Sequence, residues 1–334
     1  MNKIRSLLNA LEKSKLLWFW LVLYFICYVP YTIQSKSLGK HISALQIFPY
    51  TSLGSFFTTI VEFFVLGLIF SKGKDIFAFW KKLQFSVASV GTGIACAMIS
   101  ITTTASYMLQ GVAVITMMLL MRGGMLSLAP INDLRQKRKI STKSWSGFVL
   151  AFIAICCGIL GAGKIPFAGF IILALYIGAY SVSLNFYGKN QGNFLFLCSA
   201  QIIACASMLF ISCCGIILFK QTFVLISANQ IFKGFSIGIL AQLIGIFGPL
   251  IILTPVEQTY SVPIHRSGSI IAGIVAQKLL GNKIDNSSIL GTLFFIAAII
   301  VLATRKSSVQ TSKNDSIINL SVQQFIPTGT INKN

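Results

Sequence analysis

The sequence contains few acidic side chains and few histidines. Its 334 residues include 7 Asp and Glu against 27 Lys and Arg, and the histidines are His41 and His265 alone. The eight cysteines all lie within apolar runs, and no C-x-x-C pair stands beside a histidine tract. A zinc or redox site would therefore lack ligands. We expect no metal and no cofactor.

Motifs of catalysis and of nucleotide hydrolysis are also missing. The chain has no complete G-x-x-x-x-G-K-[ST] loop for ATP phosphates, and neither G-x-S-x-G nor H-E-x-x-H occurs. The few carboxylates within apolar runs do not form a pair suited to acid and base catalysis. We therefore expect no catalytic residues, no enzyme and no self-contained ATP-driven pump.

Apolar residues dominate the sequence. Hydrophobic residues make up 55%, charged residues 10%, and the mean hydropathy is +0.81. A soluble domain carries about 25% charged residues, so this composition indicates an integral membrane protein that lies in a lipid bilayer. The basic excess falls in short tracts between apolar runs, without a basic face bearing aromatics. It therefore fits the positive-inside rule and excludes nucleic acid as a partner.

Ten apolar runs have about the length that a bilayer core of ~30 Å requires. Basic residues precede the first run, as in a signal peptide, but no small-residue cleavage box follows, so we expect a retained helix. The runs are Leu16–Ile33, Leu45–Phe70, Phe85–Leu109, Val114–Leu134, Ser144–Ala162, Ile165–Tyr187, Asn193–Phe219, Ile231–Leu253, Gln258–Leu280 and Ser287–Ala303.

One stretch of the sequence occurs twice. Residues 121–147 return as residues 265–291, so Arg122 aligns with Arg266 and Gly124 with Gly268 at an offset of 144. The same offset lays the first five runs over the second five. Because five is odd, the second copy crosses the membrane in the opposite sense. The sequence predicts an all-α integral membrane fold with ten transmembrane helices in two inverted five-helix repeats.

The predicted parts are a cytoplasmic segment at residues 1–15, repeats at 16–162 and 163–304, and a disordered cytoplasmic tail at 305–334. Segments on the side of the amino end hold 18 basic residues and the opposite loops hold seven, which places both termini in the cytoplasm. No organelle address is recognisable, so we expect a multi-pass protein of the bacterial inner (cell) membrane. Monomer and homodimer both remain open.

An arginine inside an apolar run costs free energy in lipid and requires a reason. Arg122 and Arg266 each lie about eight residues, or ~12 Å, into their helices from opposite faces, so they should converge near the midplane. Gly123, Gly124 and Gly268 would soften these helices. A guanidinium suits carboxylate or phosphate, which predicts binding of an anionic or zwitterionic small molecule. The alternative is an internal ion pair with Glu62.

Other polar residues are candidates for the same cavity. Glu62 and His265 are candidates for coupling to protons, whereas tyrosines near helix ends are expected to be interfacial anchors. The expected anchors are Tyr31, Tyr50 and Tyr187. The residues expected to orient the ligand are Tyr28, Tyr176, Tyr180, Gln201 and Gln242.

The segment 280–285, Leu-Gly-Asn-Lys-Ile-Asp followed by Gly291, resembles the L-G-E-R-L-S pattern that closes each half of the drug/metabolite transporter superfamily. Residues 136–141 followed by Gly147 are its counterpart. Arg122-Gly123 resembles the solute-carrier branch with nucleotide-sugar carriers, and Arg122 and Arg266 are similar, by helix position, to basic residues in the fourth and ninth helices of the phosphate translocators. The resemblance implies ten helices in two inverted halves, cytoplasmic termini and alternating access. Asn282 and Arg138 stand where that pattern has glutamate.

These observations predict a secondary-active transporter of a small polar, anionic or zwitterionic metabolite. One alternative keeps the fold and exports amino acids or cationic drugs, with Glu62 essential and the arginines structural. Another is a membrane enzyme or a non-transporting receptor.

Overall fold

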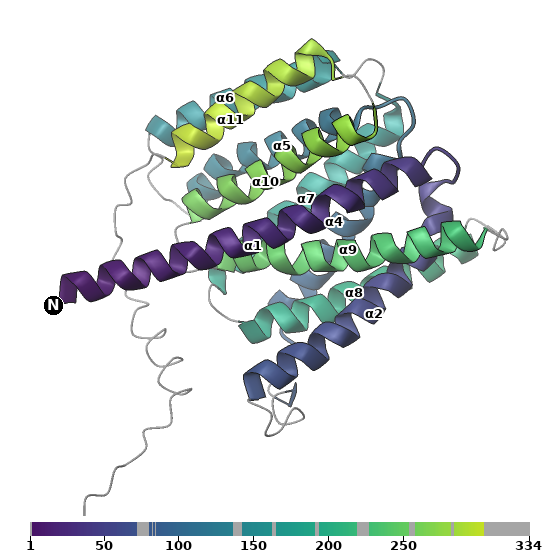
Figure 1. Ribbon diagram of the computed structural model, residues 1–334, viewed down its shortest axis with the longest axis horizontal. Coiled ribbons are helices and arrows are strands. Elements are labelled where there is room, and N and C mark those ends of the chain that lie inside the picture. Colours follow the sequence, from purple (N-terminus) through teal and green to yellow (C-terminus); the bar gives the residue numbers. More distant parts are fainter. Residues whose placement is uncertain are drawn as a thin grey trace, which may run out of the picture. The chain divides into compact units, whose positions relative to one another are not determined.

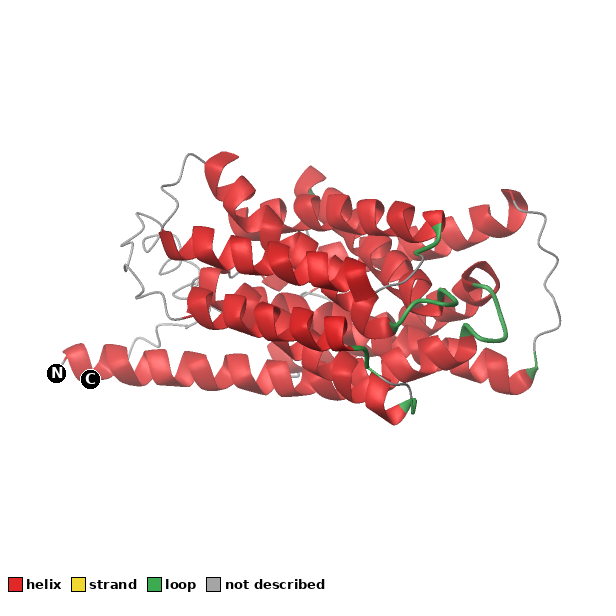
Figure 2. Ribbon diagram, turned by 90° about the horizontal axis from the view of Figure 1, so that it is seen from above, coloured by secondary structure: helices red, strands yellow, loops and turns green. Residues whose placement is uncertain are grey.

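The computed structural model describes residues 2–71, 80–81, 83, 85–135, 142–161, 165–190, 194–218, 227–253, 258–281 and 284–303. The regular structure of these residues is α-helical, and short loops join the helices (Figure 2). The tail at 305–334, predicted to be disordered, lies outside the described residues.

The described residues form ten helices, labelled as in Figure 1, and each corresponds to one of the ten apolar runs. They are α1 (Asn2–Leu38), α2 (Ala44–Ser71), α4 (Val87–Met108), α5 (Val114–Arg135), α6 (Thr142–Gly161), α7 (Phe167–Lys189), α8 (Phe194–Leu218), α9 (Ala228–Leu253), α10 (Gln258–Leu279) and α11 (Asn286–Ala303).

Helix α1 differs most from its predicted limits, because it begins at Asn2 and not near Leu16. The segment 2–15 is rich in Leu, Lys, Arg and Glu, which favour helix. Extending a helix that already exists also avoids the cost of nucleation. Residues 2–15 are therefore the first turns of α1 and not a separate segment.

Length and composition mark this chain as a helical, multi-pass membrane protein. Within the described residues, five stretches are long and apolar enough to cross a bilayer, and three helices carry shorter apolar stretches. The five are Leu17–Leu38, Val87–Met108, Phe167–Tyr187, Leu195–Gly215 and Ala228–Ile252, and the shorter ones are Val114–Leu126, Trp145–Leu160 and Asn286–Val301.

Exposed and buried residues are distributed as in a protein that faces lipid. Large apolar side chains such as Phe56, Phe152 and Phe210 are exposed, whereas many serines and threonines are buried. Buried hydroxyls need partners, and several donate to the carbonyl four residues earlier, as Thr58 does to Gly54 at 2.8 Å. The apolar surface can thus lie in lipid while polar groups remain inside the bundle.

The helices pack in matching pairs when the chain is compared with itself at the offset of 144 residues. Helices α5 and α10 have the same bounds at this offset. Helix α1 packs on α9 and α10, and its equivalent α7 packs on α4 and α5. Helix α2 packs on α9, and its equivalent α8 on α4. The pairs α6 with α11, α5 with α10 and α2 with α8 lie side by side in Figure 1 and are in contact.

Two of the equivalent crossings depend on glycine. A Cβ on Gly54 of α2 would lie 2.1 Å from the carbonyl oxygen of Phe235, and one on Gly238 of α9 would lie 2.0 Å from that of Thr51. At the equivalent crossing, a Cβ on Gly93 of α4 would lie 2.7 Å from the carbonyl oxygen of Ala200 on α8. Any side chain there would force the helices apart, so these glycines set the interhelical distance.

The segment 280–285, singled out in the sequence, joins α10 to α11. Gly281 has a φ of 69°, the left-handed conformation that closes a helix at its C-terminus. Asp285 then accepts hydrogen bonds from the backbone N–H of Ser288 at 2.9 Å and from its hydroxyl at 2.7 Å. This pattern is that of an N-cap, so the described part of the segment ends one helix and begins the next.

Candidate functional site

A cavity of about 90 Å³ lies inside the bundle. Side chains from seven helices line it: α1, α4, α5, α7, α8, α9 and α10. About 10–15 Å³ is enough for one water molecule, so the cavity has room for a small ligand or several waters. Six of the candidate site residues predicted from the sequence line it, namely Tyr28, Arg122, Tyr180, Gln201, Gln242 and His265, whereas Glu62, Tyr176 and Arg266 do not.

Arg122 of α5 is buried against tyrosines from two other helices. Its guanidinium donates hydrogen bonds to the hydroxyls of Tyr28 on α1 and Tyr176 on α7. The guanidinium carbon lies 5.6 and 5.5 Å from the centroids of those rings, within the range of cation–π attraction. Its Nε has no hydrogen-bond partner. Arg122 is thus held by neutral groups.

Arg266 of α10 has no exposed surface, and its Nε, Nη1 and Nη2 have no hydrogen-bond partner. The guanidinium carbon lies 4.3 Å from the ring centroid of Tyr180 on α7. A cation–π contact returns about 2 kcal/mol or somewhat more when desolvated, which is less than the several kcal/mol that burial of an ion costs. The contact with Tyr180 therefore offsets only part of the free energy that burial of the Arg266 charge costs.

One pair of tyrosines connects the two arginines. The rings of Tyr176 and Tyr180, four residues apart on α7, have centroids 5.1 Å apart, and each lies against one guanidinium. Three successive contacts therefore connect the two arginines: Arg122 with Tyr176, Tyr176 with Tyr180, and Tyr180 with Arg266. The ion pair with Glu62, the alternative weighed above, is not formed, because Arg122 binds hydroxyls and the nitrogens of Arg266 are unpartnered.

His265 lines the cavity beside Arg266 and is buried. Its ring packs edge-on against Tyr24 of α1, with centroids 4.6 Å apart, and neither ring nitrogen has a hydrogen-bond partner. A Cβ on Gly248 of α9 would lie 3.0 Å from Nε2, so glycine at that position leaves room for the imidazole.

Glu62 of α2 does not line the cavity. Its side chain has Gln242 of α9 as a hydrogen-bonding partner, and its Oε1 has none. Gln242 donates to Gln201 of α8 at 3.3 Å, and Gln201 donates to the carbonyl oxygen of Gly245 at 2.7 Å. Both glutamines line the cavity. A chain of hydrogen bonds therefore leads from the carboxyl group to the cavity.

The prediction that Tyr31 and Tyr187 are interfacial anchors is wrong. Both are 2% exposed and line the cavity. The hydroxyl of Tyr31 lies 2.8 Å from Thr104 Oγ1, and that of Tyr187 lies 3.6 Å from Cys96 Sγ. These partners replace the water that a tyrosine hydroxyl finds at a membrane surface. Tyr50, the third expected anchor, is partly buried and packs against a group of buried apolar residues that includes Tyr31 and Ile47.

Two further tyrosines were missed by the sequence analysis. Tyr24 lines the cavity, and the hydroxyl of Tyr107 lies 2.5 Å from that of Tyr28. A spacing of four and three residues marks one face of a helix, and it relates Tyr24, Tyr28 and Tyr31. This spacing could therefore have placed Tyr24 beside Tyr28 from the sequence alone. Tyr107 had no such signal, because only the packing of α4 against α1 brings it there.

The glycines beside the arginines do not break their helices. Helices α5 and α10 are continuous through Gly123, Gly124 and Gly268. A Cβ on Gly123 would lie 2.4 Å from Ile155 of α6, one on Gly124 would lie 2.6 Å from Ile177, and one on Gly268 would lie 2.8 Å from Leu21. Their function is close packing: Gly124 against α7 and Gly268 against α1, its equivalent.

Comparison with protein families finds no family model that matches this chain, and comparison with curated proteins finds no match.

Proposed function

We propose that this chain is a secondary-active transporter that carries a small polar, anionic or zwitterionic metabolite by alternating access. The observation that carries the proposal is Arg266: a fully buried guanidinium whose three nitrogens lack hydrogen-bond partners, next to a cavity that Arg122 and His265 line. Buried charges in proteins are paired or serve function. An anion in the cavity would supply the missing partner.

The donors around the cavity favour a carboxylate or phosphate over a cation. A guanidinium binds either group with two parallel hydrogen bonds, and Arg266 has donors free for both. Tyr28 and Tyr180, which line the cavity, would orient the rest of the molecule, with Tyr176 supporting Arg122 from behind. Gln201 and Gln242 would meet its neutral or positive part on the opposite wall. The cavity volume of about 90 Å³ implies a small ligand in this conformation.

Alternating access would follow from ten transmembrane helices in two inverted repeats. The matching contacts of α1 with α9 and of α7 with α4 support this arrangement. So does the equal placing of Arg122 and Arg266 on α5 and α10. The distribution of basic residues supports cytoplasmic termini, and a bacterial inner membrane is the proposed location. This architecture is also what the resemblance to the drug/metabolite transporters implies.

Glu62 is the proposed group for coupling to protons, because hydrogen bonds through Gln242 and Gln201 lead from it to the cavity. Glu62→Gln keeps the shape of the side chain and removes its ability to bind a proton. Accumulation driven by an imposed proton gradient should fall at least about tenfold, while exchange of labelled for unlabelled substrate persists. Asp285→Asn, the same chemical change in a helix cap, is the control. Gradient-driven accumulation by Glu62→Gln at the wild-type level would exclude this role and leave His265 as the candidate.

Thermal unfolding of the purified protein with a panel of compounds tests the proposed function. Small carboxylates, phosphates, amino acids and cationic amines are compared, since a ligand at 100 times its Kd stabilises the folded state by about 2.7 kcal/mol. We expect a carboxylate or phosphate to raise the melting temperature of wild type and of Lys278→Met, in which an exposed cation of α10 is removed, but not of Arg266→Met. Stabilisation by amines alone would favour a cationic-drug exporter. Stabilisation by lipids or a protein partner alone would remove the basis for a carrier.

A further inference from the structure

Lys36, near the end of α1, joins this helix to the carboxyl-terminal end of α4. Its Nζ donates hydrogen bonds to the carbonyl oxygens of Leu109 at 2.6 Å and Val112 at 2.7 Å. Leu109 is the C-cap of α4, where the helix dipole is negative and carbonyls lack helical partners. A half-buried ammonium at that position ties the carboxyl-terminal ends of α1 and α4 together.

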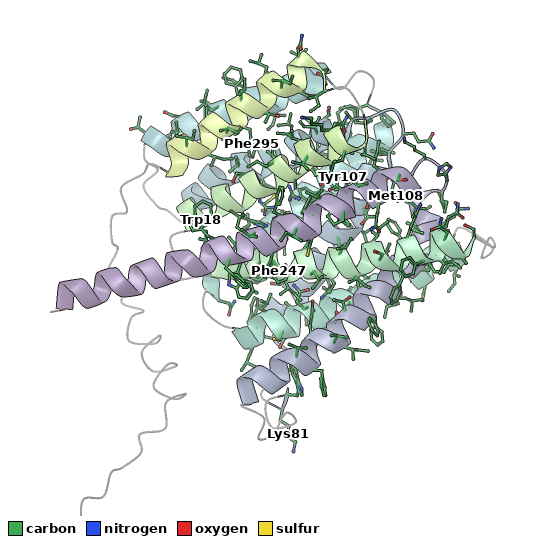
Figure 3. The ribbon with its side chains drawn as sticks, viewed as in Figure 1. Trp18, Lys81, Tyr107, Met108, Phe247 and Phe295 are labelled. Carbon is green, nitrogen blue, oxygen red and sulfur yellow. The ribbon has the colours of Figure 1, made fainter. Side chains whose placement is uncertain are left out.

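Further contacts between α1 and α4 lie on either side of Lys36. Gly39 meets Met108 so closely that a Cβ on Gly39 would lie 2.6 Å from the Cα of Met108. Deeper in the bundle, Tyr31 bonds to Thr104 and Tyr28 to Tyr107. Figure 3 marks Tyr107 and Met108 beside the carboxyl-terminal half of α1. These contacts form a seam between α1 and α4, by which we mean the line of contacts from Tyr28 to Gly39, and the seam is closed over several helical turns.

The equivalent helices of the second half, α7 and α9, do not form such a contact within the part of the chain that the structure describes. At the offset of the repeat, α7 corresponds to α1 and α9 to α4. Within the described residues, α7 and α9 make no more than marginal contact, whereas α1 packs on α4. The cavity lining agrees: it continues to Tyr187 and Ile252 in the last turns of α7 and α9, but stops at Tyr31 and Thr103 on α1 and α4. The two ends of the cavity thus differ.

The contacts between α1 and α4 are connected to Arg122, which lines the cavity. A guanidinium only donates hydrogen bonds, so the hydroxyl of Tyr28 accepts from Arg122 and must give its own proton to Tyr107 Oη, 2.5 Å away. Arg122 thereby fixes the direction of the bond that joins α1 to α4. Arg266 has no such connection, because its nitrogens contact no hydroxyl.

We propose that Lys36 and the hydrogen-bonded pair Tyr28–Tyr107 form a gate between α1 and α4. This inference rests on the proposed function, because the gate would be opened by an anion that binds to Arg122. The anion takes donors that Arg122 now gives to Tyr28, which weakens the bond to Tyr107 and leaves Lys36 to hold the seam alone. The gate thus consists of positioning residues, Lys36, Tyr28 and Tyr107. They couple the binding of an anion at Arg122 to the opening of the cavity at the α1–α4 end.

Native Cys96, which lines the cavity, reports on the gate without any added ligand. Its modification by a small membrane-impermeant cationic thiosulfonate, which cannot act as an anion on Arg122, is followed by mass spectrometry in intact cells and in inside-out vesicles, so that each side of the membrane is probed. In wild type, we expect rapid modification from the α7–α9 end and slow modification from the α1–α4 end. Lys36→Met should raise the slow rate at least about tenfold, because it removes two charge-assisted hydrogen bonds and the loss of even one has an effect of that size. Lys40→Met, which removes an exposed neighbouring cation, should leave it unchanged.

The coupling to Arg122 has its own matched pair of variants. Arg122→Met and Arg266→Met each remove one buried cation from the same site, but only the first breaks the contact with Tyr28. We expect Arg122→Met to speed modification from the α1–α4 end and Arg266→Met to leave its rate unchanged. Equal rates in the two variants would overturn the coupling. Tyr107→Phe, which keeps the ring and loses the hydroxyl, should also speed it.

Two results would overturn the gate: equal rates for Lys36→Met and Lys40→Met, or, should Lys36→Met not fold, a wild-type rate for Tyr107→Phe. Folding of each variant is checked by its melting temperature. Because the labelling needs no substrate, it remains decisive even if no anion is transported. Conversely, an intact gate together with failure of every anion to stabilise the protein would overturn the proposed function alone.

Discussion

Arg266→Met is expected to stabilise the folded protein and to abolish most transport. The guanidinium is fully buried without a hydrogen bond, so removing it strands no partner and relieves the cost of desolvation. Replacing buried ionic groups by apolar residues of similar volume often stabilises a protein by about 1–4 kcal/mol. Loss of a charged donor to the ligand should lower transport about 100-fold, the equivalent of the upper part of the range for hydrogen bonds to charged groups. A gain in stability with a loss of function is the signature of a residue kept for its ligand.

The measurement pairs melting temperature in detergent with uptake into proteoliposomes at equal protein density. Arg266→Lys serves as a second variant, because it retains charge but loses the planar fork. It should recover little transport. A structural role predicts the opposite pattern for Arg266→Met, namely a lower melting temperature with substantial transport in the protein that remains folded, and that result would overturn ligand binding by Arg266.

Arg122→Met is expected to impair both stability and transport. Its guanidinium donates to Tyr28 and Tyr176, so methionine would leave two buried hydroxyls without their donor. Each such loss costs about 1–3 kcal/mol, although Tyr28 keeps Tyr107 as a partner. The two arginines, equivalent in the repeat, should thus have opposite effects on stability and the same effect on transport.

Tyr28→Phe combined with Arg122→Met separates these contributions. If the arginine stabilises the fold through the Tyr28 hydroxyl, the double variant should lose less stability than the sum of the single ones. Thermal unfolding of all four proteins gives the coupling energy. Strict additivity would show that the hydrogen bond contributes nothing, and an unchanged uptake rate in Arg122→Met would remove this residue from the proposed site.

Much of the fold could be predicted because membrane helices have a simple length requirement. Every apolar run of the sequence corresponds to a helix, and α5 and α10 end within a residue or so of their predicted limits. The equivalent positions of Arg122 and Arg266 could also be read from the sequence, because a charge within an apolar run is costly and the repeat aligns the two residues. These inferences use only local composition and self-similarity.

The environment of each polar side chain could not be predicted in the same way. Tyr31 and Tyr187 lie near the ends of apolar runs, and only the packing of α1 and of α7 on α4 turns them into the cavity. The sequence offered an ion pair between Glu62 and an arginine as an alternative, because opposite charges attract. Helix α2 instead packs on α8 and α9, which brings Glu62 to Gln242. Hydropathy specifies that a helix is buried in lipid, but not its rotation or its neighbours.

The small volume of the cavity also bears on how this protein could be blocked. A molecule that carried the anionic group of the proposed substrate on a bulkier body could reach the arginines from the end where α7 and α9 make no more than marginal contact. It would satisfy Arg266 and yet be too large for the helices to close behind it. Substrates and competitive inhibitors of the proposed transporter would then share the same anionic group and differ in size, so that enlarged analogues of its substrate would be the first inhibitors to test.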